Sequence, residues 1–298
     1  GVGSRLADKA KKSLNSDCLL ISHDQKDLTS ENSIKISTKS VVNPSTHLIR
    51  GSALETSDEV KKNISNYSTV ILMSNLAGKA GAGIGPIVSR ICKQEQKNLL
   101  SFVIMPFKFE KERIFQSGIS LKRIRQDSQC TIVVDNDALL DSNPDLTQKQ
   151  CYDITNKAIE SMMHSLKSSE ISGDTNILST SKDTDNIEVS LKDSLRMLYE
   201  DAPPDSIKRS MLYVYGNGDI PVGVLNTISS ITGGTFDEDS THVEMSSEES
   251  KVVMLSSIHG ETKFDKYDPL GIISQENTID WDEPECSIDC ELNLKQLE

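Results

Sequence analysis

The sequence predicts an α/β protein whose parallel sheet is covered by helices on both faces. Apolar runs such as 69–74 and 131–134 alternate along the first half of the chain with segments of helical periodicity. Strands that are buried on both faces of a parallel sheet have this continuous apolar character. A second observation is the glycine-rich stretch 77–86, which stands between a strand-like run and a helix-like segment. Such a stretch is typical of a strand–helix junction in this class of fold.

The expected elements of this half follow one another in a regular order. The expected helices cover residues 4–14, 57–66, 86–97, about 112–125 and 147–166, and the expected strands cover 18–22, 34–36, 69–74, 99–105 and 131–134. Ser57 is the expected cap of the second helix, because Asp58 and Glu59 follow in its first turn. Ligands of such sheets bind beyond the carboxyl ends of the strands, which places the glycine-rich stretch and Asn136 at a candidate site.

The second half of the chain is organised differently. Residues 167–190 are polar and predict a connector, whereas 191–260 predict a smaller α+β unit with a helix at 190–200, a helix at 221–231 and strands at 211–215, 241–245 and 251–258. From Glu261 to Glu298 there are eleven acidic residues against three lysines, which predicts a disordered acidic tail. The expected division is therefore 1–166, 167–190, 191–260 and 261–298.

Charge and cysteine content limit the classes of function. The chain of 298 residues has a formal net charge of −13, which argues against nucleic acid as a partner, because a binder needs clustered Lys and Arg. No apolar run approaches the roughly 18 residues of a membrane span. Cys18, Cys92 and Cys130 lie in or beside apolar runs and favour reduced core thiols of a cytoplasmic protein. We predict no metal site. Because the chain opens on Gly1 rather than Met, we expect a preceding segment.

The glycine-rich stretch favours phosphate binding. Gly78, Gly81, Gly83 and Gly85 would let the backbone approach a ligand, and the following helix directs its unpaired N–H groups at the same place. Two common phosphate motifs do not fit. The Walker pattern needs a further glycine where Met73 stands, and the dinucleotide-binding fingerprint has a different glycine spacing.

Three motifs in order carry a clear resemblance. They are the Gly-rich segment 77–86, which matches a Gly-Gly-Gly-Thr-Gly-Thr-Gly signature in register, Met105-Pro106-Phe107-Lys108-Phe109-Glu110, and the segment 132–140 with Asn136-Asp137. With these motifs the chain resembles the tubulin/FtsZ superfamily, as a divergent FtsZ-like protein of prokaryotic, and we expect archaeal, type. The resemblance covers about 1–165 and, more loosely, 190–260. It implies a parallel, Rossmann-like nucleotide-binding sheet, a long central helix at 147–166 and a smaller C-terminal domain.

The resemblance also implies a cofactor and roles for individual residues. GTP or GDP is the implied cofactor, with Mg²⁺ as its companion ion. The implied phosphate contacts are Gly1, Gly3 and Arg5 of a first loop, preceded by a strand before residue 1, and Gly78, Lys79, Ala80, Gly81, Ala82 and Gly83 of the signature. Glu110 would contact the ribose, Asn136 and Asn156 the base, and Tyr152 would stack on the base. Asp174, in the loop after the central helix, would act as the catalytic residue at the site of the next subunit in a filament.

The sequence departs from the family pattern at several of these positions. Ala80 and Ala82 replace both threonines of the signature, and each lost hydrogen bond weakens binding by about 0.5–1.5 kcal/mol. The family's central-helix aspartate falls at Asn156 or Lys157. An aspartate offers guanine two acceptor interactions, whereas Asn156 offers one acceptor oxygen and Lys157 none. Lys79 is either a phosphate contact or a solvated lysine, and Asp174 either a catalytic or a solvated loop carboxylate. The residues leave these alternatives open.

Two functions are therefore consistent with the sequence. The first is an FtsZ-like cytoskeletal protein of cell division or cell shape that binds GTP, polymerises head to tail and hydrolyses GTP weakly or conditionally. The second is a non-hydrolysing scaffold or regulator with a degenerate nucleotide site. The expected partners are further copies of the chain, an FtsZ paralogue and a protein that binds the acidic tail. The basic residues Lys122, Arg123 and Arg125 form either a solvated patch or a contact for another subunit or the acidic tail.

Overall fold

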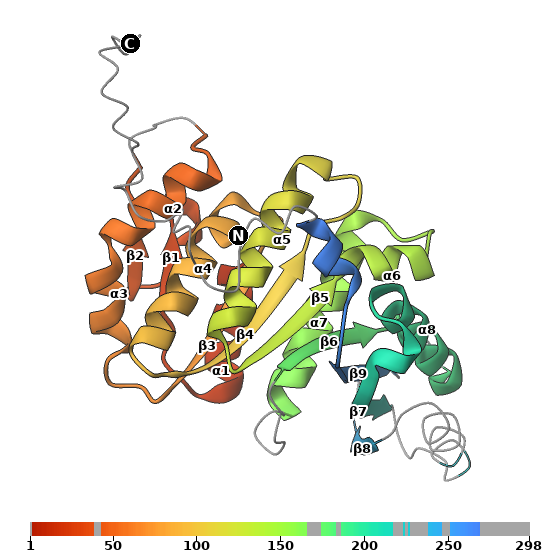
Figure 1. The fold of residues 1–298 in the computed structure, drawn as a ribbon. Coiled ribbons are helices and arrows are strands. Elements are labelled where there is room, and N and C mark those ends of the chain that lie inside the picture. Colours follow the sequence, from red (N-terminus) through yellow and green to blue (C-terminus); the bar gives the residue numbers. More distant parts are fainter. Residues whose placement is uncertain are drawn as a thin grey trace.

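The computed structural model describes residues 2–38, 43–165, 174–182, 186–216, 223, 226, 238–245 and 251–268, in which helices flank two sheets (Figure 1). The helices are α1 (Val2–Leu14), α2 (Thr46–Glu55), α3 (Ser57–Ile64), α4 (Lys79–Gln94), α5 (Lys111–Asp127), α6 (Asn136–Ser142), α7 (Gln148–Ser165) and α8 (Ile187–Asp201). The strands are β1 (Leu20–Ser22), β2 (Ser33–Lys35), β3 (Thr69–Asn75), β4 (Asn98–Met105), β5 (Cys130–Asp135), β6 (Asp174–Thr180), β7 (Ile207–Gly216), β8 (Glu238–Met245) and β9 (Lys251–Ile258). Three short 3₁₀ helices are η1 (Gln25–Asp27), η2 (Pro204–Ser206) and η3 (Lys263–Tyr267).

The larger sheet has seven strands in the order β3-β4-β5-β6-β9-β7-β8. Strands β3 to β6 are parallel neighbours, β9 runs antiparallel to β6 and β7, and β8 is parallel to β7. The two remaining strands, β1 and β2, form a separate parallel pair. The α/β class with a largely parallel sheet is thus confirmed, and the carboxyl ends of β3, β4 and β5 meet at one edge.

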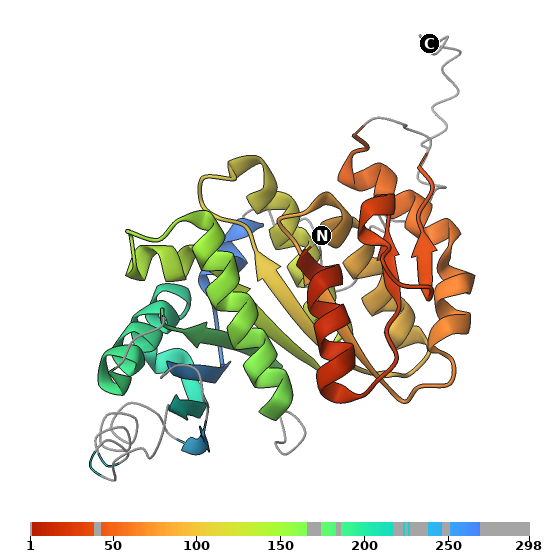
Figure 2. The same ribbon diagram turned by 180° about the vertical axis from the view of Figure 1, so that it is seen from behind.

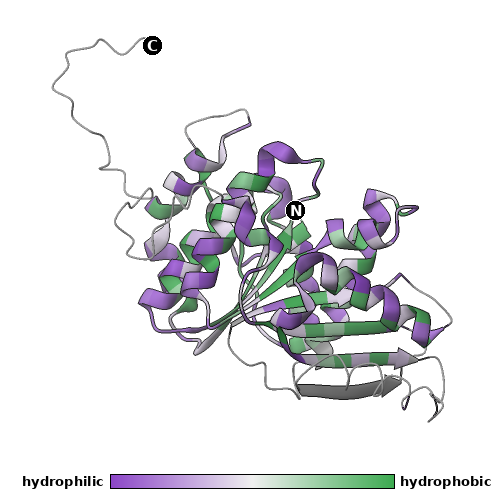
Figure 3. Cartoon of the chain, turned by 45° about the vertical axis from the view of Figure 1, so that its right-hand side comes forward, coloured by the Kyte–Doolittle hydropathy of each residue, from purple (hydrophilic) through white to green (hydrophobic). Residues whose placement is uncertain are grey.

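Helices cover both faces of the larger sheet. α1 and α7 lie side by side on one face, where Lys9 and Glu160 form an ion pair between them (Figure 2). α5 and α8 cover the other face (Figure 1). In β5, Ile132 packs in the cluster beneath α1 and α7, whereas the next residue, Val133, packs in the cluster beneath α5 and α8. Hydrophobic residues accordingly fill the strands in Figure 3, while the outer faces of the helices are largely hydrophilic.

Strand β6 lies within the stretch for which the sequence predicts a connector. Its polar residues suggest a loop, yet Asn176, Ser179 and Thr180 are buried. The Asn176 amide donates to Cys130 Sγ over 3.2 Å, and the Thr180 hydroxyl donates to the Val252 carbonyl over 3.4 Å. These partners make a polar strand tolerable inside the sheet. Because β6 also pairs with β9, the C-terminal strands continue the first sheet. The division into domains stays a prediction.

The helix expected at 221–231 lies, apart from residues 223 and 226, outside the described residues.

A gap separates the two sheets. Within the described residues, β1 pairs only with β2, and the first strand of the larger sheet, β3, pairs only with β4. A cavity of about 980 Å³ lies between these edges and is lined by Leu20 and Ile21 of β1 and by Val70 and Leu72 of β3. One strand parallel to both neighbours would join the sheets. The strand that the resemblance implies before residue 1 stays a prediction.

Candidate functional site

The carboxyl end of β3 is joined to α4 by a tight turn. The Asn75 carbonyl accepts the N–H of Gly78 over 3.1 Å, and the Asn75 side chain accepts the N–H of Ala77 over 3.0 Å. α4 starts after an extended Gly78 (φ −90°, ψ 139°), and no side chain caps it. The first N–H groups of a helix have no acceptor within the helix and carry its positive end. Gly78 and Lys79 line the cavity, so α4 presents an anion seat to it.

The glycine-rich stretch is helical, whereas the sequence predicts a loop as far as residue 86. α4 begins at Lys79 and runs through Pro86. Proline has no N–H to donate to the carbonyl of Ala82, four residues earlier. That carbonyl instead accepts Arg50 Nη2 over 3.1 Å and Ser120 Oγ over 2.8 Å. Donors from α2 and α5, both buried, thus replace the missing helical bond, and the sequence gives no local sign of them.

The glycines of α4 serve close packing of the helix. A Cβ on Gly81 would lie 2.0 Å from the Asn75 carbonyl oxygen, and a Cβ on Gly85 would lie 2.8 Å from Ser74 Oγ. Gly83 faces α2, where a Cβ would lie 3.1 Å from Ile49. These contacts show that Gly81, Gly83 and Gly85 let α4 pack closely on β3 and α2, and their role in ligand binding stays a prediction. At Gly78, a Cβ would make only an ordinary contact of 3.4 Å with the Asn75 carbonyl oxygen.

The charged groups beside the seat already have contacts within the protein or point to solvent. The Lys79 ammonium donates to the Asn43 side chain over 2.9 Å, and Arg5 is exposed on α1. His23, which follows β1 and lines the cavity, has a buried Nδ1 without a hydrogen-bond partner. Burial lowers the pKa of His23, against an opposing effect of Asp24. The unpaired Nδ1 therefore makes His23 a candidate contact for a ligand at the wall of the cavity.

A second group of polar side chains lies at the carboxyl end of β5. Asn136, the first residue of α6, is fully buried, and its Oδ1 accepts the Thr155 hydroxyl over 2.7 Å. The Asn136 amide nitrogen has no hydrogen-bond partner, and neither has Oδ1 of Asn156 on α7. Because buried polar atoms are normally paired, one unpaired donor and one unpaired acceptor on neighbouring elements indicate a place for a polar ligand.

Aromatic rings lie beside this group. Phe107 is buried, stacks on Phe109 with a centroid distance of 5.1 Å, and meets the half-buried Tyr152 edge-on at 5.4 Å. Glu110 caps the loop by accepting the Phe107 N–H over 3.2 Å and pairs with Arg113 over 2.6 Å. Tyr152 and the 60% exposed Phe109 thus offer ring faces for a flat ligand.

Comparison with known proteins finds a family match in the first half of the chain. The model of the Tubulin/FtsZ family, GTPase domain, matches residues 8–144. Cell division protein FtsZ 2 of Halobacterium salinarum is 27% identical over 100 residues, which are 34% of this chain and 25% of that protein. Cell division protein FtsZ of Haloferax mediterranei is 31% identical over 116 residues, which are 39% of this chain and 30% of the relative. The chain thus matches between a quarter and a third of the length of these relatives.

Solved structures share the fold at low sequence identity. An FtsZ dimer from M. jannaschii aligns with a TM-score of 0.65 at 18% identity over 86% of this chain and 85% of that one. CetZ from Methanosaeta thermophila aligns with a TM-score of 0.67 at 16% identity over 91% and 88% of the two chains. The chain is thus similar to FtsZ in sequence within residues 8–144 and in fold over most of its length.

The expected site residues lie in separate parts of the structure. The cavity brings together five of them: Gly3, Gly78, Lys79, Ala80 and Gly81. Ala82 and Gly83 are buried within α4, so their side-chain positions face packing partners. Glu110, Asn136, Tyr152 and Asn156 form the second group, next to the first along the edge of the sheet. Gly1 lies outside the described residues, and Gly3, expected in a loop, is part of α1.

Asp174 of the FtsZ-like chain lies far from both groups along the sheet. It is the first residue of β6 and pairs with Cys130, the first residue of the parallel neighbour β5. Asn136 follows the last residue of β5, so the length of that strand separates it from Asp174. The sequence predicts Asp174 in a loop, whereas its backbone belongs to the sheet. In this position Asp174 is at the opposite end of the strands from the anion seat of α4 and from Asn136.

Two further observations concern ligands and membranes. Among the described residues of the FtsZ-like chain, no three His, Cys, Asp or Glu side chains gather closely enough to hold a metal ion. In the same ranges, no helix combines the length and apolar character needed to cross a membrane. His23 is a further candidate that the structure adds, and its position directly after β1 is the only signal for it in the sequence.

Proposed function

We propose that this FtsZ-like chain binds GTP or GDP, with the phosphates at the start of α4 and the base between Tyr152 and Asn136. The buried, unpaired amide nitrogen of Asn136 carries this proposal. It is a donor at the place where a guanine oxygen would arrive, and the unpaired Asn156 Oδ1 is an acceptor for a guanine N–H. Leaving such atoms unpaired costs about 1–3 kcal/mol each, and a bound base would recover that free energy.

We further propose that the chain assembles head to tail with copies of itself or with an FtsZ paralogue. The position of Asp174 supports this arrangement, because head-to-tail stacking brings the start of β6 to the seat of the adjacent subunit. The named relatives are cell division proteins, and we propose a cytoplasmic role in division or cell shape. Mg²⁺ would accompany the phosphates, and a protein partner would bind the acidic tail.

A non-hydrolysing scaffold is the second candidate function, and specific observations favour it. Lys79 is held by Asn43, and Ala80 and Ala82 supply no hydroxyl. The packing of Gly81 against Asn75 also keeps the backbone of α4 close to β3. Electrostatic stabilisation and positioning supply most of the catalysis of phosphoryl transfer. A seat with few charged contacts would therefore bind a nucleotide but hydrolyse it slowly.

Replacing Tyr152 by alanine tests the base end of the seat. Loss of a stacking ring weakens nucleotide binding by about 1–3 kcal/mol, or roughly 5- to 150-fold. Isothermal titration with GDP measures this loss directly. Tyr199→Ala is the matched control, because Tyr199 lies on α8 and is 37% exposed. Equal affinities of the Tyr152→Ala and Tyr199→Ala variants would remove Tyr152 from the site.

Replacing Asp174 by alanine tests catalysis separately from binding. If Asp174 positions the attacking water across the interface, phosphate release falls by at least about tenfold while GTP affinity is kept. The exposed Asp205 provides the control variant Asp205→Ala. An unchanged rate of phosphate release from Asp174→Ala would return Asp174 to a structural role and favour the scaffold.

A further inference from the structure

The last described segment, residues 262–268, packs against α5 and reaches the end of β5. The Thr262 N–H and hydroxyl donate to the Asp265 carboxylate over 2.7 and 2.9 Å, which closes a capping box at the start of η3. Figure 1 shows this segment leaving β9 and running to the side of α5. We call residues 262–268 the C-terminal clasp.

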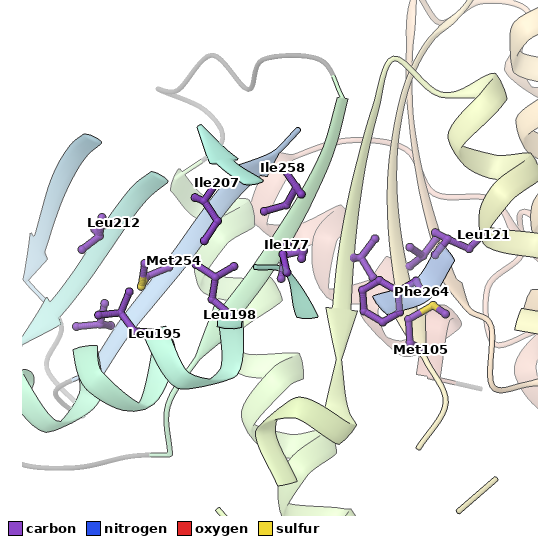
Figure 4. Close-up of a cluster of buried hydrophobic side chains, with 14 of the residues drawn as sticks. Met105, Leu121, Ile177, Leu195, Leu198, Ile207, Leu212, Met254, Ile258 and Phe264 are labelled. Atoms are coloured by element: carbon purple, nitrogen blue, oxygen red, sulfur yellow. The ribbon is translucent and has the colours of Figure 1, made fainter. Parts of the chain in front are cut away.

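The C-terminal clasp is firmly attached to α5. Phe264 is only 2% exposed and packs beside Met105 (Figure 4). Tyr267 lies so close to α5 that a Cβ on Gly118 would be 2.6 Å from its own Cβ. Two ion pairs, Arg125 to Asp265 over 2.8 Å and Lys122 to Asp268 over 3.2 Å, complete the attachment.

Lys263 of the clasp holds two buried carboxylates together. Its ammonium forms ion pairs with Asp135 at the end of β5 and, over 2.7 Å, with Asp201 at the end of α8. Both carboxylates are fully buried, and the Lys263 side chain is 18% exposed. Burial and the neighbouring charge of Asp135 raise the pKa of Asp201. Without its ammonium, this pair would leave uncompensated charge in the core.

Asp135 connects Lys263 to the second group of the nucleotide seat. One oxygen of this carboxylate, Oδ2, meets the Lys263 ammonium. The other, Oδ1, accepts the N–H of Asp137 over 2.9 Å and thereby caps α6. Asn136 lies between these two residues in the chain. The orientation that Lys263 gives to the carboxylate therefore also sets the first turn of α6, on which Asn136 is placed.

We infer that Lys263 is a positioning residue for the base end of the seat and that the C-terminal clasp thereby controls nucleotide affinity. The inference rests on the proposed nucleotide binding.

The charged groups around Asp135 determine how nucleotide affinity should depend on pH. They are Asp137 of α6, which pairs with Lys108 over 3.1 Å, Asp201 of α8, and Lys263 and Tyr267 of the clasp. Burial, with a further effect of Asp135, raises the pKa of Tyr267 to about 12, so this phenol stays neutral. In a Lys263→Met variant the ammonium is lost, and a proton bound between the two carboxylates would take the place of its positive charge. Lowering the pH should therefore restore the orientation of Asp135.

Titration of the full chain with GTP tests the inference in four forms: the natural protein, Lys263→Met, Lys263→Arg and the control Lys266→Met, whose lysine is exposed on the same segment. We expect Lys263→Met to bind roughly tenfold more weakly than Lys266→Met near pH 8 and to approach it near pH 5.5. Lys263→Arg, which keeps the charge, should stay within about threefold of the natural protein. Equal affinities of Lys263→Met and Lys266→Met at both pH values would overturn the inference.

Hydrogen exchange separates this outcome from failure of the proposed function. If the natural protein binds no nucleotide, nucleotide binding is refuted, whereas the clasp still predicts faster exchange of the amides of residues 136–142 in Lys263→Met than in Lys266→Met. Equal exchange in the two variants would refute the clasp. If Lys263→Met fails to fold, two other variants are compared with Lys266→Met in the same measurements. They are Lys263→Arg and the double variant Lys263→Met with Asp201→Asn, which removes one buried charge.

Discussion

Replacing Gly81 by valine is expected to destabilise the whole fold as well as to remove nucleotide binding. A Cβ at this position would lie 2.0 Å from the carbonyl oxygen and 2.7 Å from the carbonyl carbon of Asn75. Both are backbone atoms of the turn that joins β3 to α4, so they cannot rotate away as a side chain would. Overpacking of this kind costs about 1–3 kcal/mol, and more where backbone has to move. We expect a loss at the upper end of this range, measured as a lower midpoint of urea unfolding.

Gly51→Ala is the matched control for the Gly81 substitution. Gly51 lies in the helix α2, and a Cβ there would meet nothing within 4 Å. Alanine in a helix is more favourable than glycine by up to about 1 kcal/mol, so this variant should be as stable as the natural protein or slightly more stable. If Gly81→Val unfolds at the same urea concentration as the natural protein, the close packing of α4 on β3 is wrong.

Replacing Lys263 by methionine is expected to lower the free energy of unfolding by as much as Gly81→Val or more. The substitution keeps most of the side-chain volume but removes the ammonium between Asp135 and Asp201, both fully buried. Breaking a buried ion pair by removing one partner costs about 3–5 kcal/mol, because the remaining charge has neither water nor a counterion. Chemical unfolding near pH 8 measures this loss.

The loss should shrink as the pH falls. Burial and the charge of Asp135 raise the pKa of Asp201, and loss of the Lys263 ammonium removes an opposing effect, so Asp201 binds a proton more tightly in the folded protein than in the unfolded chain. The folded state then binds more protons than the unfolded state, so the free energy of unfolding increases with decreasing pH. The deficit relative to Lys266→Met should therefore be smaller near pH 5 than near pH 8. A deficit that is independent of pH would mean that the two carboxylates are not the cause.

The sequence predicts the parts of the fold that local pattern determines. The continuous apolar run of β5 is typical of a strand buried on both faces, and it is fully buried. The motif around Asn136 follows this strand directly, and the structure places it at the carboxyl end as expected. Tyr152 lies near the start of α7, which the sequence predicts within two residues, and its ring meets that of Phe107 in the loop after β4.

Distant contacts decide the features that sequence reasoning could not predict. The glycine-rich stretch becomes helical through Pro86 because Arg50 and Ser120 supply donors to the Ala82 carbonyl, and neither is near in sequence. β6 is polar, and its place inside the sheet depends on β5 and β9. Lys263 looks like one charge in an acidic tail, and only its position between Asp135 and Asp201 gives it a role.

The melting temperature of the full chain with GTP, GDP, ATP and no nucleotide, each with Mg²⁺, tests the nucleotide seat most directly. At a hundredfold excess over the dissociation constant, a ligand stabilises the folded state by about 2.7 kcal/mol, which raises the melting temperature by roughly 5–10 °C for a chain of this size. We expect this shift with GTP and GDP and a much smaller one with ATP. Identical melting temperatures in all four samples would contradict nucleotide binding and leave the scaffold as the function of this chain.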